Sequence, residues 1–339
     1  MFKSTDLPID KSLWGSIFLG VIGSPDPYGR QLNGMGGGLS SLSKVCITGP
    51  PTHPEADVDY TFVSLGVKNT NVDYSSNCGN MSAAIGPYAV NSGLVPVESD
   101  GDKTVRIHNT NTGKIIHSTF PIVDGEAAAN GSFSIDGVSG TAAKVKLDFV
   151  KPAGSRTGRL LPTGRKVDRF DNVRATCIDV GNPCVFVQAV ELGVDGAITP
   201  LEIESHLDLL QKLDSIRRQA GVAMGLAQSI DEVPGSVPKI AFVSEPEQGS
   251  SSNVVARAIS VGQPHKAIPV TVALALATAA RMPETTVSEC IRGQSDEIEL
   301  SHASGTLKVN ATFSESGEVL AGSVLRTARR LMEGTIFWK

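Results

Sequence analysis

NCGNMSAAIGPYAV, residues 77–90, is the segment around which the rest of the chain is interpreted. Asn77 is a favourable amino-terminal cap for a helix. Apolar side chains then recur on one face at helical spacing: Met81, Ala84, Ile85, Tyr88 and Ala89. On both sides of this segment, residues 45–48, 59–67 and 105–109 are short runs rich in β-branched and aromatic residues, bounded by polar turns. We therefore expect one helix surrounded by strands.

Cys78 stands at the start of this predicted helix. A helix amino terminus presents unpaired backbone N–H groups and a partial positive charge, which lower the pKa of a thiol and bind carboxylates. Gly79 lets a ligand approach the backbone closely, and Asn80 supplies a neutral donor. The competing interpretation is a small apolar cysteine packed beneath the helix. The polar residues on both sides of Cys78 favour the functional interpretation.

Lys44 follows a glycine-rich loop in GGGLSSLSKV, residues 36–45, where Ser40, Ser41 and Ser43 precede it. Burial penalises the charged form of a lysine, so a lysine beside a desolvated pocket can act as a general base. The alternative is a solvated loop lysine. The glycines do not form a phosphate-binding loop, because the GxxxxGK[ST] order and the helix after it are missing.

The second half of the chain repeats this plan faintly. We expect strands at residues 173–180, 185–190 and 239–243, and a helix at 200–223. A second apolar helix is opened by QPHKAIPV, residues 263–270, which sets His265 and Lys266 at its start and so mirrors Cys78. Two facing helix tips would suit a substrate with several carboxylates.

The length of 339 residues suits two domains. We expect an α+β fold of two pseudo-symmetric lobes, each a curved, mostly antiparallel sheet around a central helix, with the active site in the cleft. The amino-terminal lobe spans 1–160 and is joined by 313–339, the carboxy-terminal lobe spans 161–312, and the hinge lies in 151–164. A short helix is expected at 13–21. The last strand and helix, residues 318–339, return to the first lobe.

Composition excludes several classes of function. A net charge of -5 without a basic block disfavours nucleic-acid binding. Apolar runs fall short of the roughly 20 residues that span a membrane, and the amino terminus lacks a signal-peptide pattern. The five cysteines show no CxxC spacing, and HExxH, DxDxDG and GxSxG are missing. We expect a soluble, cytoplasmic protein without metal or organic cofactor; a homodimer is left open.

Several long segments together resemble the PrpF family of 2-methylaconitate cis-trans isomerases, which has the diaminopimelate-epimerase-like fold. They are GSPDPYGRQLNGMGGG, SSLSKV, VDYSSNCGNMSAAIGPYAV, VRIHNTNTGK, KLDFVKPAGSRTGRLLPTG, VGNPCVFV, MGLA, HKA and RTARRLMEG. In that family a lysine of SxSK and a cysteine of NCGN are the proposed catalytic pair, and Lys44 and Cys78 match them. The resemblance implies cofactor-free proton transfer at an allylic carbon of an aconitate-type tricarboxylate or a related dicarboxylate.

The candidate substrate-binding residues combine the helix tips with polar loop positions whose alternative interpretation is simple turn chemistry. They are Ser41, Ser43, Gly79, Asn80, Met81, Asn109, Asn182, His265, Lys266, Ser304 and Gly305. Two departures from the family are visible. The chain starts at MFKSTDLP, after the family's first strand and RGGTS-type loop, so that strand is either missing or replaced, and SHASG stands where an HPSG-like segment is expected.

Other functions remain open at this point. Within the family, the alternatives are an aconitate or methylitaconate Δ-isomerase and an oxalomesaconate tautomerase. From another class, a non-catalytic tricarboxylate-binding protein is compatible with the missing first strand. Epimerisation of an amino acid by two cysteines is disfavoured, because QPHKAIPV contains no cysteine.

Overall fold

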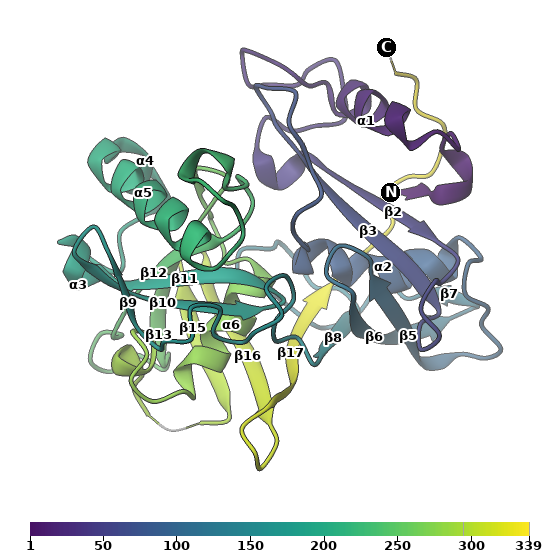
Figure 1. Cartoon of the computed structure of the whole chain (residues 1–339). Coiled ribbons are helices and arrows are strands. Elements are labelled where there is room, and N and C mark those ends of the chain that lie inside the picture. The colour runs from purple at the N-terminus through teal and green to yellow at the C-terminus, as the bar shows by residue number, and fades with distance from the viewer. Residues whose placement is uncertain (294, 339) are drawn as a thin grey trace.

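The computed structural model describes residues 1–293 and 295–338. Its strands join into one continuous hydrogen-bonded network, with α2 (Gly79–Asn91) and α6 (Val270–Ala280) near the middle of the molecule (Figure 1). The other α-helices are α1 (Trp14–Ile22), α3 (Ala189–Leu192), α4 (Pro200–Ser205) and α5 (Leu207–Ala223).

The strands fall into an amino-terminal and a carboxy-terminal set. The first set is β1 (Phe2–Lys3), β2 (Lys44–Gly49), β3 (Val58–Leu65), β4 (Val72–Asp73), β5 (Gly101–Asn109), β6 (Lys114–Val123), β7 (Glu126–Ala127) and β8 (Lys144–Val150). The second set is β9 (Asp168–Phe170), β10 (Val173–Val180), β11 (Asn182–Gln188), β12 (Lys239–Ser244), β13 (Val254–Ser260), β14 (Gln263–Pro264), β15 (Glu297–His302), β16 (Gly305–Phe313) and β17 (Val319–Thr327).

The amino-terminal strands wrap around α2. Strand β2 runs antiparallel to β3, β3 parallel to β5, and β5, β6 and β8 follow as antiparallel neighbours. Small and β-branched residues of α2, including Ala83, Ile85 and Ala89, are buried against these strands. Their burial stabilises the helix by roughly 25 cal/mol per Å² of apolar surface removed from water.

The carboxy-terminal strands wrap around α6 in the same way, with β11 parallel to β12 and β13 parallel to β15. Every residue from Val270 to Ala279 is buried. A helix that is apolar on all sides is stable only when it is enclosed, and the surrounding strands enclose α6. The apolar composition of residues 270–280 therefore follows from its central position.

Strand β17 connects the two sets of strands. It pairs antiparallel with β16 on one side and with β8 on the other, where Val324 faces Val309 and Leu147. Each central helix contacts β17 as well. Because β17 pairs with both sets, it does not assign residues 313–339 to either one, and the division into residues 1–160 with 313–339 and residues 161–312 stays a proposal.

Outer layers cover both sets of strands. Helix α1 packs Phe18 and Val21 against Val45 and Val63 of β2 and β3. On the other side, α5 packs Leu213 and Ile216 against Val187 and Phe242 of β11 and β12. Figure 1 shows these helices on the outside of their strands. The predicted helix at 13–21 and the predicted strands at 45–48, 173–180 and 239–243 are confirmed within a few residues.

Several local predictions were wrong. Helix α6 starts at Val270, so His265 and Lys266 precede it. Pro269, the N-cap, has an extended backbone, and a proline also disfavours the helical conformation in the residue before it, Ile268. The cap of α2 is Cys78 and not Asn77. The expected helix at 200–223 is interrupted at His206, whose backbone is non-helical.

The two ends of the chain also differ from expectation. Residues 328–338 contain no helix. The segment is short and mostly exposed, and a short helix is stable only when it packs against the rest of the protein. At the other end, β1 pairs parallel with β2 through Phe2 and Ile47 and through Lys3 and Thr48. The first residues of the chain thus form a two-residue strand beside β2.

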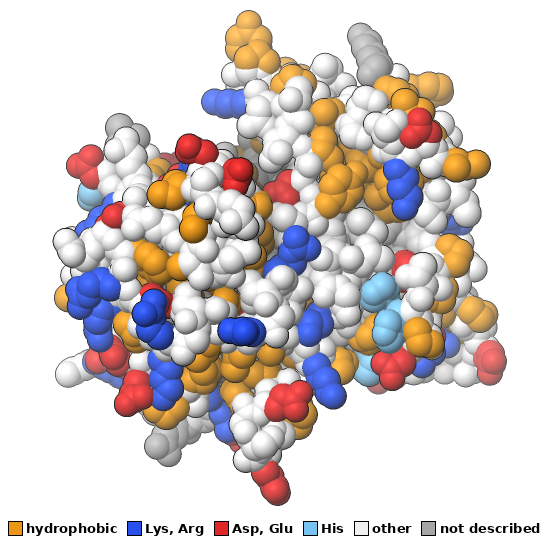
Figure 2. Space-filling view, viewed as in Figure 1, with side chains coloured by type: hydrophobic (Ala, Val, Ile, Leu, Met, Phe, Trp, Pro, Cys, Tyr) orange, Lys and Arg blue, Asp and Glu red, His pale blue; other side chains and the backbone are white. Residues whose placement is uncertain are grey.

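The surface carries no large single-sign field on the face that Figure 2 shows. There, Lys and Arg side chains are interspersed with Asp and Glu. Within residues 1–293 and 295–338, no helix combines the length and the apolarity that crossing a membrane requires.

Candidate active site

The amino-terminal tips of α2 and α6 meet at the centre of the molecule. Gly79 lies so close to α6 that an added Cβ would stand 2.6 Å from Cβ of Val270. Asn182, at the start of β11, holds the contact: its Oδ1 accepts from the backbone N–H of Asn77 at 2.9 Å, and its Nδ2 donates to Asn77 O at 2.6 Å and to Thr271 Oγ1 at 3.1 Å. One buried amide therefore fixes both tips.

A cavity lies where the two tips meet. Of the residues predicted from sequence, Ser41, Lys44, Cys78, Gly79, Asn80 and His265 line it. Its free volume is about 40 Å³, which is room for little more than a water molecule.

Lys44 and Cys78 reach this cavity from different elements. Lys44 is the first residue of β2, and its Nζ donates to Cys78 Sγ at 3.3 Å. The same Nζ lies 6.0 Å from the centre of the Phe62 ring. An amine, a thiol and an aromatic face thus form one partly buried wall.

The surroundings of Cys78 favour its thiolate. Burial by itself would raise the pKa of this thiol, but the charge of Lys44, the backbone N–H of Met81 and the hydrogen bond from Lys44 outweigh burial and lower the pKa below its ordinary value. Burial instead raises the pKa of Cys46 and of Cys184 to about 12. Of these three cysteines, Cys78 is therefore the one whose thiol ionises most readily.

His265 lines the same cavity as Lys44 and Cys78. It follows β14 and precedes α6. Burial, followed by the charge of Lys44, lowers the pKa of His265 to about 4, so the ring is neutral at pH 7. Among the hydrogen bonds of the described residues, its buried Nδ1 has no partner.

Two cationic residues near the cavity were not predicted from the sequence. Lys239, the first residue of β12, lines the cavity and is 7% exposed. Arg326 of β17 donates from Nη2 to Asn80 Oδ1 at 2.9 Å and so orients the amide at the tip of α2. A lysine that interrupts an otherwise apolar strand, KIAFV, is the signal that could have identified Lys239.

The other predicted residues lie outside the cavity lining. Asn109 caps a turn by accepting from Thr112, and Ser43 donates to Gln31 Oε1 and fixes the glycine loop. The positions that do not line the cavity are Ser43, Met81, Asn109, Asn182, Lys266, Ser304 and Gly305. Several of them support its walls through the backbone or, for Asn182, through the contact between the tips.

Ser304 and Gly305 belong to a contact between the two sets of strands. Ser304 Oγ donates to the carbonyl of Lys266 at 2.6 Å. Asp136, on the loop before β8, accepts from the backbone N–H of Thr306 at 2.7 Å. This contact holds the segment that leads to His265.

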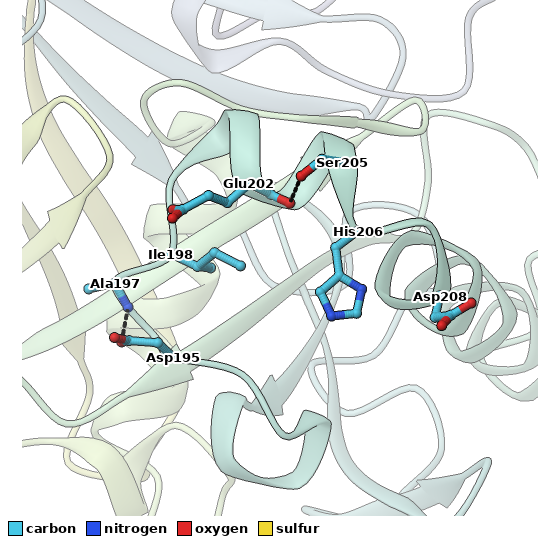
Figure 3. Close-up of a pocket in the computed structure, with 7 residues that line it drawn as sticks. All are labelled: Asp195, Ala197, Ile198, Glu202, Ser205, His206 and Asp208. Carbon is cyan, nitrogen blue, oxygen red and sulfur yellow. Dashed lines mark hydrogen bonds between the residues drawn. The ribbon is translucent and has the colours of Figure 1, made fainter.

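A larger, open hollow lies away from these residues, between α4 and the loop before it (Figure 3). Its polar groups are already used locally: Glu202 forms a capping box with Thr199, and Asp195 accepts from the N–H of Ala197 at 2.8 Å. The side chains therefore stabilise the start of α4 and leave little to hold a ligand. Across the described part of the chain, no group of three or more His, Cys, Asp or Glu is arranged to hold a metal ion.

Strands wrapped around two central helices whose tips meet, with an amine and a thiol at the meeting point, are the arrangement of the diaminopimelate-epimerase-like fold. A hydroxyproline epimerase from Agrobacterium vitis shares this fold at a TM-score of 0.53 and 12% identity, with 94% of this chain and 78% of that chain covered. The predicted fold class is confirmed.

The chain belongs to the PrpF family, whose model, described as PrpF protein, matches residues 1–339. It is 37% identical to the 3-methylitaconate isomerase of Eubacterium barkeri and to the 2-methyl-aconitate isomerase of Shewanella oneidensis, each over 99% of this chain and 92% of the relative. A crystal structure of a methylitaconate-delta-isomerase superposes with a TM-score of 0.79 at 38% identity, covering 98% of this chain and 90% of the other. The resemblance inferred from sequence and the prediction of an isomerase are confirmed.

Proposed function

We propose that this protein isomerises an aconitate-type unsaturated tricarboxylate, or a closely related dicarboxylate, by moving a proton at an allylic carbon. The observation that carries the proposal is the 3.3 Å contact between Lys44 Nζ and Cys78 Sγ beside the tip of α2. Cations and helix N–H groups surround the space, and among its described lining residues there is no Asp or Glu. The surroundings therefore favour a polyanion.

The chemistry follows from where negative charge develops. Removal of a proton next to a conjugated carboxylate gives a dienolate, and the carboxylate oxygens take up its charge. Fixed N–H donors at the two tips and the ammonium of Lys44 stabilise that charge, each donor typically by a few kcal/mol. With Lys44 as an ammonium and Cys78 as a thiolate, Cys78 accepts the proton from the allylic carbon and Lys44 returns one; with a neutral amine and a thiol, Lys44 accepts the proton and Cys78 returns one or holds the substrate.

Two products are accessible from one dienolate. Rotation about the weakened double bond followed by return of the proton gives the cis-trans isomer, whereas protonation at the far carbon shifts the double bond. Equal identity to a methylitaconate isomerase and to a 2-methyl-aconitate isomerase supports both outcomes. We take cis-trans isomerisation as the first proposal and Δ-isomerisation as the second.

The test is proton NMR of candidate acids incubated with the protein in deuterated water. We expect one of the acids 2-methylaconitate, aconitate and methylitaconate to lose its allylic hydrogen to solvent and to form an isomer. Lys44→Ala should lose about 10²–10⁴-fold in turnover while still binding trans-aconitate, because proton transfer is lost and the helix tips remain. Tight binding of these acids without any deuterium incorporation would contradict the proposal and favour a non-catalytic binding protein.

A further proposal concerns the location of the enzyme. We propose a cytoplasmic location, which the five free cysteines support, because reduced thiols persist there. The substrate is a small carboxylate, and the number of subunits stays open. Size-exclusion chromatography with light scattering measures that number directly.

A further inference from the structure

Lys239 is a buried cation that the proposed chemistry does not use. Its side chain is enclosed, and its Nζ donates to one acceptor, the carbonyl of Ser236, at 2.9 Å. An ammonium has three N–H donors. None of the ion pairs formed by the described residues includes Lys239. The buried ammonium of Lys239 therefore has more N–H donors than acceptors.

Lys239 lines the cavity at the helix tips and also a second, smaller one that Asp214 and Arg217 line. It is the first residue of β12 and belongs to the carboxy-terminal set, whereas Lys44 and Cys78 belong to the amino-terminal set, and all three line the same space. On the side of Lys239, His265 also lines the cavity with an unpartnered Nδ1. This part of the lining thus holds an ammonium with more donors than acceptors and a neutral ring whose Nδ1 has no partner among the described residues.

An uncompensated buried charge is costly, so its retention calls for an anion that is present during function. Burial lowers the pKa of Lys239, and the nearby Lys44 adds to this effect, whereas Cys184, Cys78 and Asp73 oppose it. A carboxylate placed against Nζ would reverse the cost, because it supplies a partner for the charged form. The Ser236 carbonyl is a dipole and cannot do so.

We propose that Lys239 binds one carboxylate of the substrate in the cavity that it lines together with Lys44 and Cys78, and thereby selects acids with a carboxylate at that position. The inference rests on the proposed function for its substrate class. Lys44 and Cys78 act at the allylic carbon, and Lys239 anchors a group that does not react. The separation between the Lys44–Cys78 pair and Lys239 sets the distance between the reacting carbon and the remote carboxylate.

The test compares Lys239→Met and Lys239→Gln with wild type and with Lys144→Met, which removes an exposed lysine of β8. Met retains most of the aliphatic stem, and Gln retains a donor for Ser236. Removal of a buried charge is often neutral or stabilising, so melting temperatures should stay at or above that of wild type. We expect both variants to bind trans-aconitate at least tenfold more weakly by calorimetry, and Lys144→Met to bind it normally.

Methyl esters of trans-aconitate locate the contact. Blocking the carboxylate that Lys239 binds should weaken binding to wild type but abolish the difference between wild type and Lys239→Met. Kinetically, KM should rise tenfold or more, with kcat changed less than threefold. Unchanged affinity in both variants, or an equal loss for every ester, would overturn the assignment.

This design separates the two proposals. Wild type that binds trans-aconitate but exchanges no hydrogen in any acid defeats the proposed function, and the calorimetric comparison still decides the role of Lys239. Wild type that turns substrate over while Lys239→Met shows normal affinity defeats only the role of Lys239. Wild type that binds no carboxylate defeats both.

Discussion

The tips of α2 and α6 occupy equivalent places in the fold but carry unequal chemistry. At α2 the N-cap is Cys78, and an amine lies 3.3 Å from its sulfur. At α6 the N-cap is Pro269, and His265, the predicted residue of this segment that lines the cavity, precedes the helix by several residues. Pro269 therefore stands where a second cysteine would be needed for a two-thiol epimerase. The residues at the α2 tip are therefore suited to react with the substrate, and those near the α6 tip to bind it.

Removal of the thiol should break this comparison most strongly. We expect Cys78→Ala to lower kcat by about 10²–10⁴-fold, because the site loses both a proton-transfer group and the partner of Lys44. Cys290→Ala is the matched control, since Cys290 is buried outside the cavity and burial raises its pKa to about 11. Steady-state kinetics measures the effect. A Cys78→Ala enzyme within threefold of wild type would remove the thiol from the reaction.

The contact between the tips can be tested without touching a reactive group. Gly79→Ala places a Cβ 2.6 Å from Val270 and forces α2 and α6 apart. Overpacking of this kind typically costs 1–3 kcal/mol, and we expect a loss of that size in the free energy of unfolding, with at least a tenfold loss in kcat/KM. Urea unfolding and steady-state kinetics measure the two losses.

Gly15→Ala is the control for the Gly79 variant. Gly15 lies in α1, where an added Cβ would meet only Val72, at an ordinary 3.7 Å. Stability at or above that of wild type is expected there, because alanine is the better helix former. If Gly79→Ala is equally harmless, the tips are not held as tightly as their contact indicates.

The same comparison shows what the sequence could predict. The position of α2 was predictable because polar residues precede an apolar repeat at helical spacing. The start of α6 was misplaced because the apolar run extends back through Ile268, while Pro269 enforces the extended backbone there. Local pattern describes the periodicity of a segment well and its first residue poorly.

Contacts between distant segments were beyond the local pattern. Nothing in residues 36–45 indicates that Lys44 meets a sulfur 34 positions later; the family resemblance supplied that pair. Lys239 was read as part of an apolar strand, and its approach to the cavity depends on the pairing of β12 with β11 and on the position of Ser236. Buried cations of this kind become visible only when the walls are assembled.

The smallest expected effect is the contribution of His265 to the pH dependence of the stability of the protein. The pKa of His265 is lowered to about 4 in the folded protein, against about 6.5 in an unfolded chain. Between these values the unfolded chain binds more protons, so wild type loses stability as pH falls through this window, by at most about 1.4 kcal/mol per pH unit from this group. His265→Gln cannot titrate and is spared that loss.

Urea unfolding at pH 8, 7 and 5 measures the effect. The stability of His265→Gln relative to wild type should be constant between pH 8 and pH 7 and should rise toward pH 5, and the titration of other groups, His302 among them, cancels in the comparison. Because His265 lies near the α6 tip, whose residues are suited to bind the substrate and not to react with it, kcat should change less than threefold. A relative stability that does not vary with pH would mean that the ring accepts a proton in the folded state as readily as in the unfolded one.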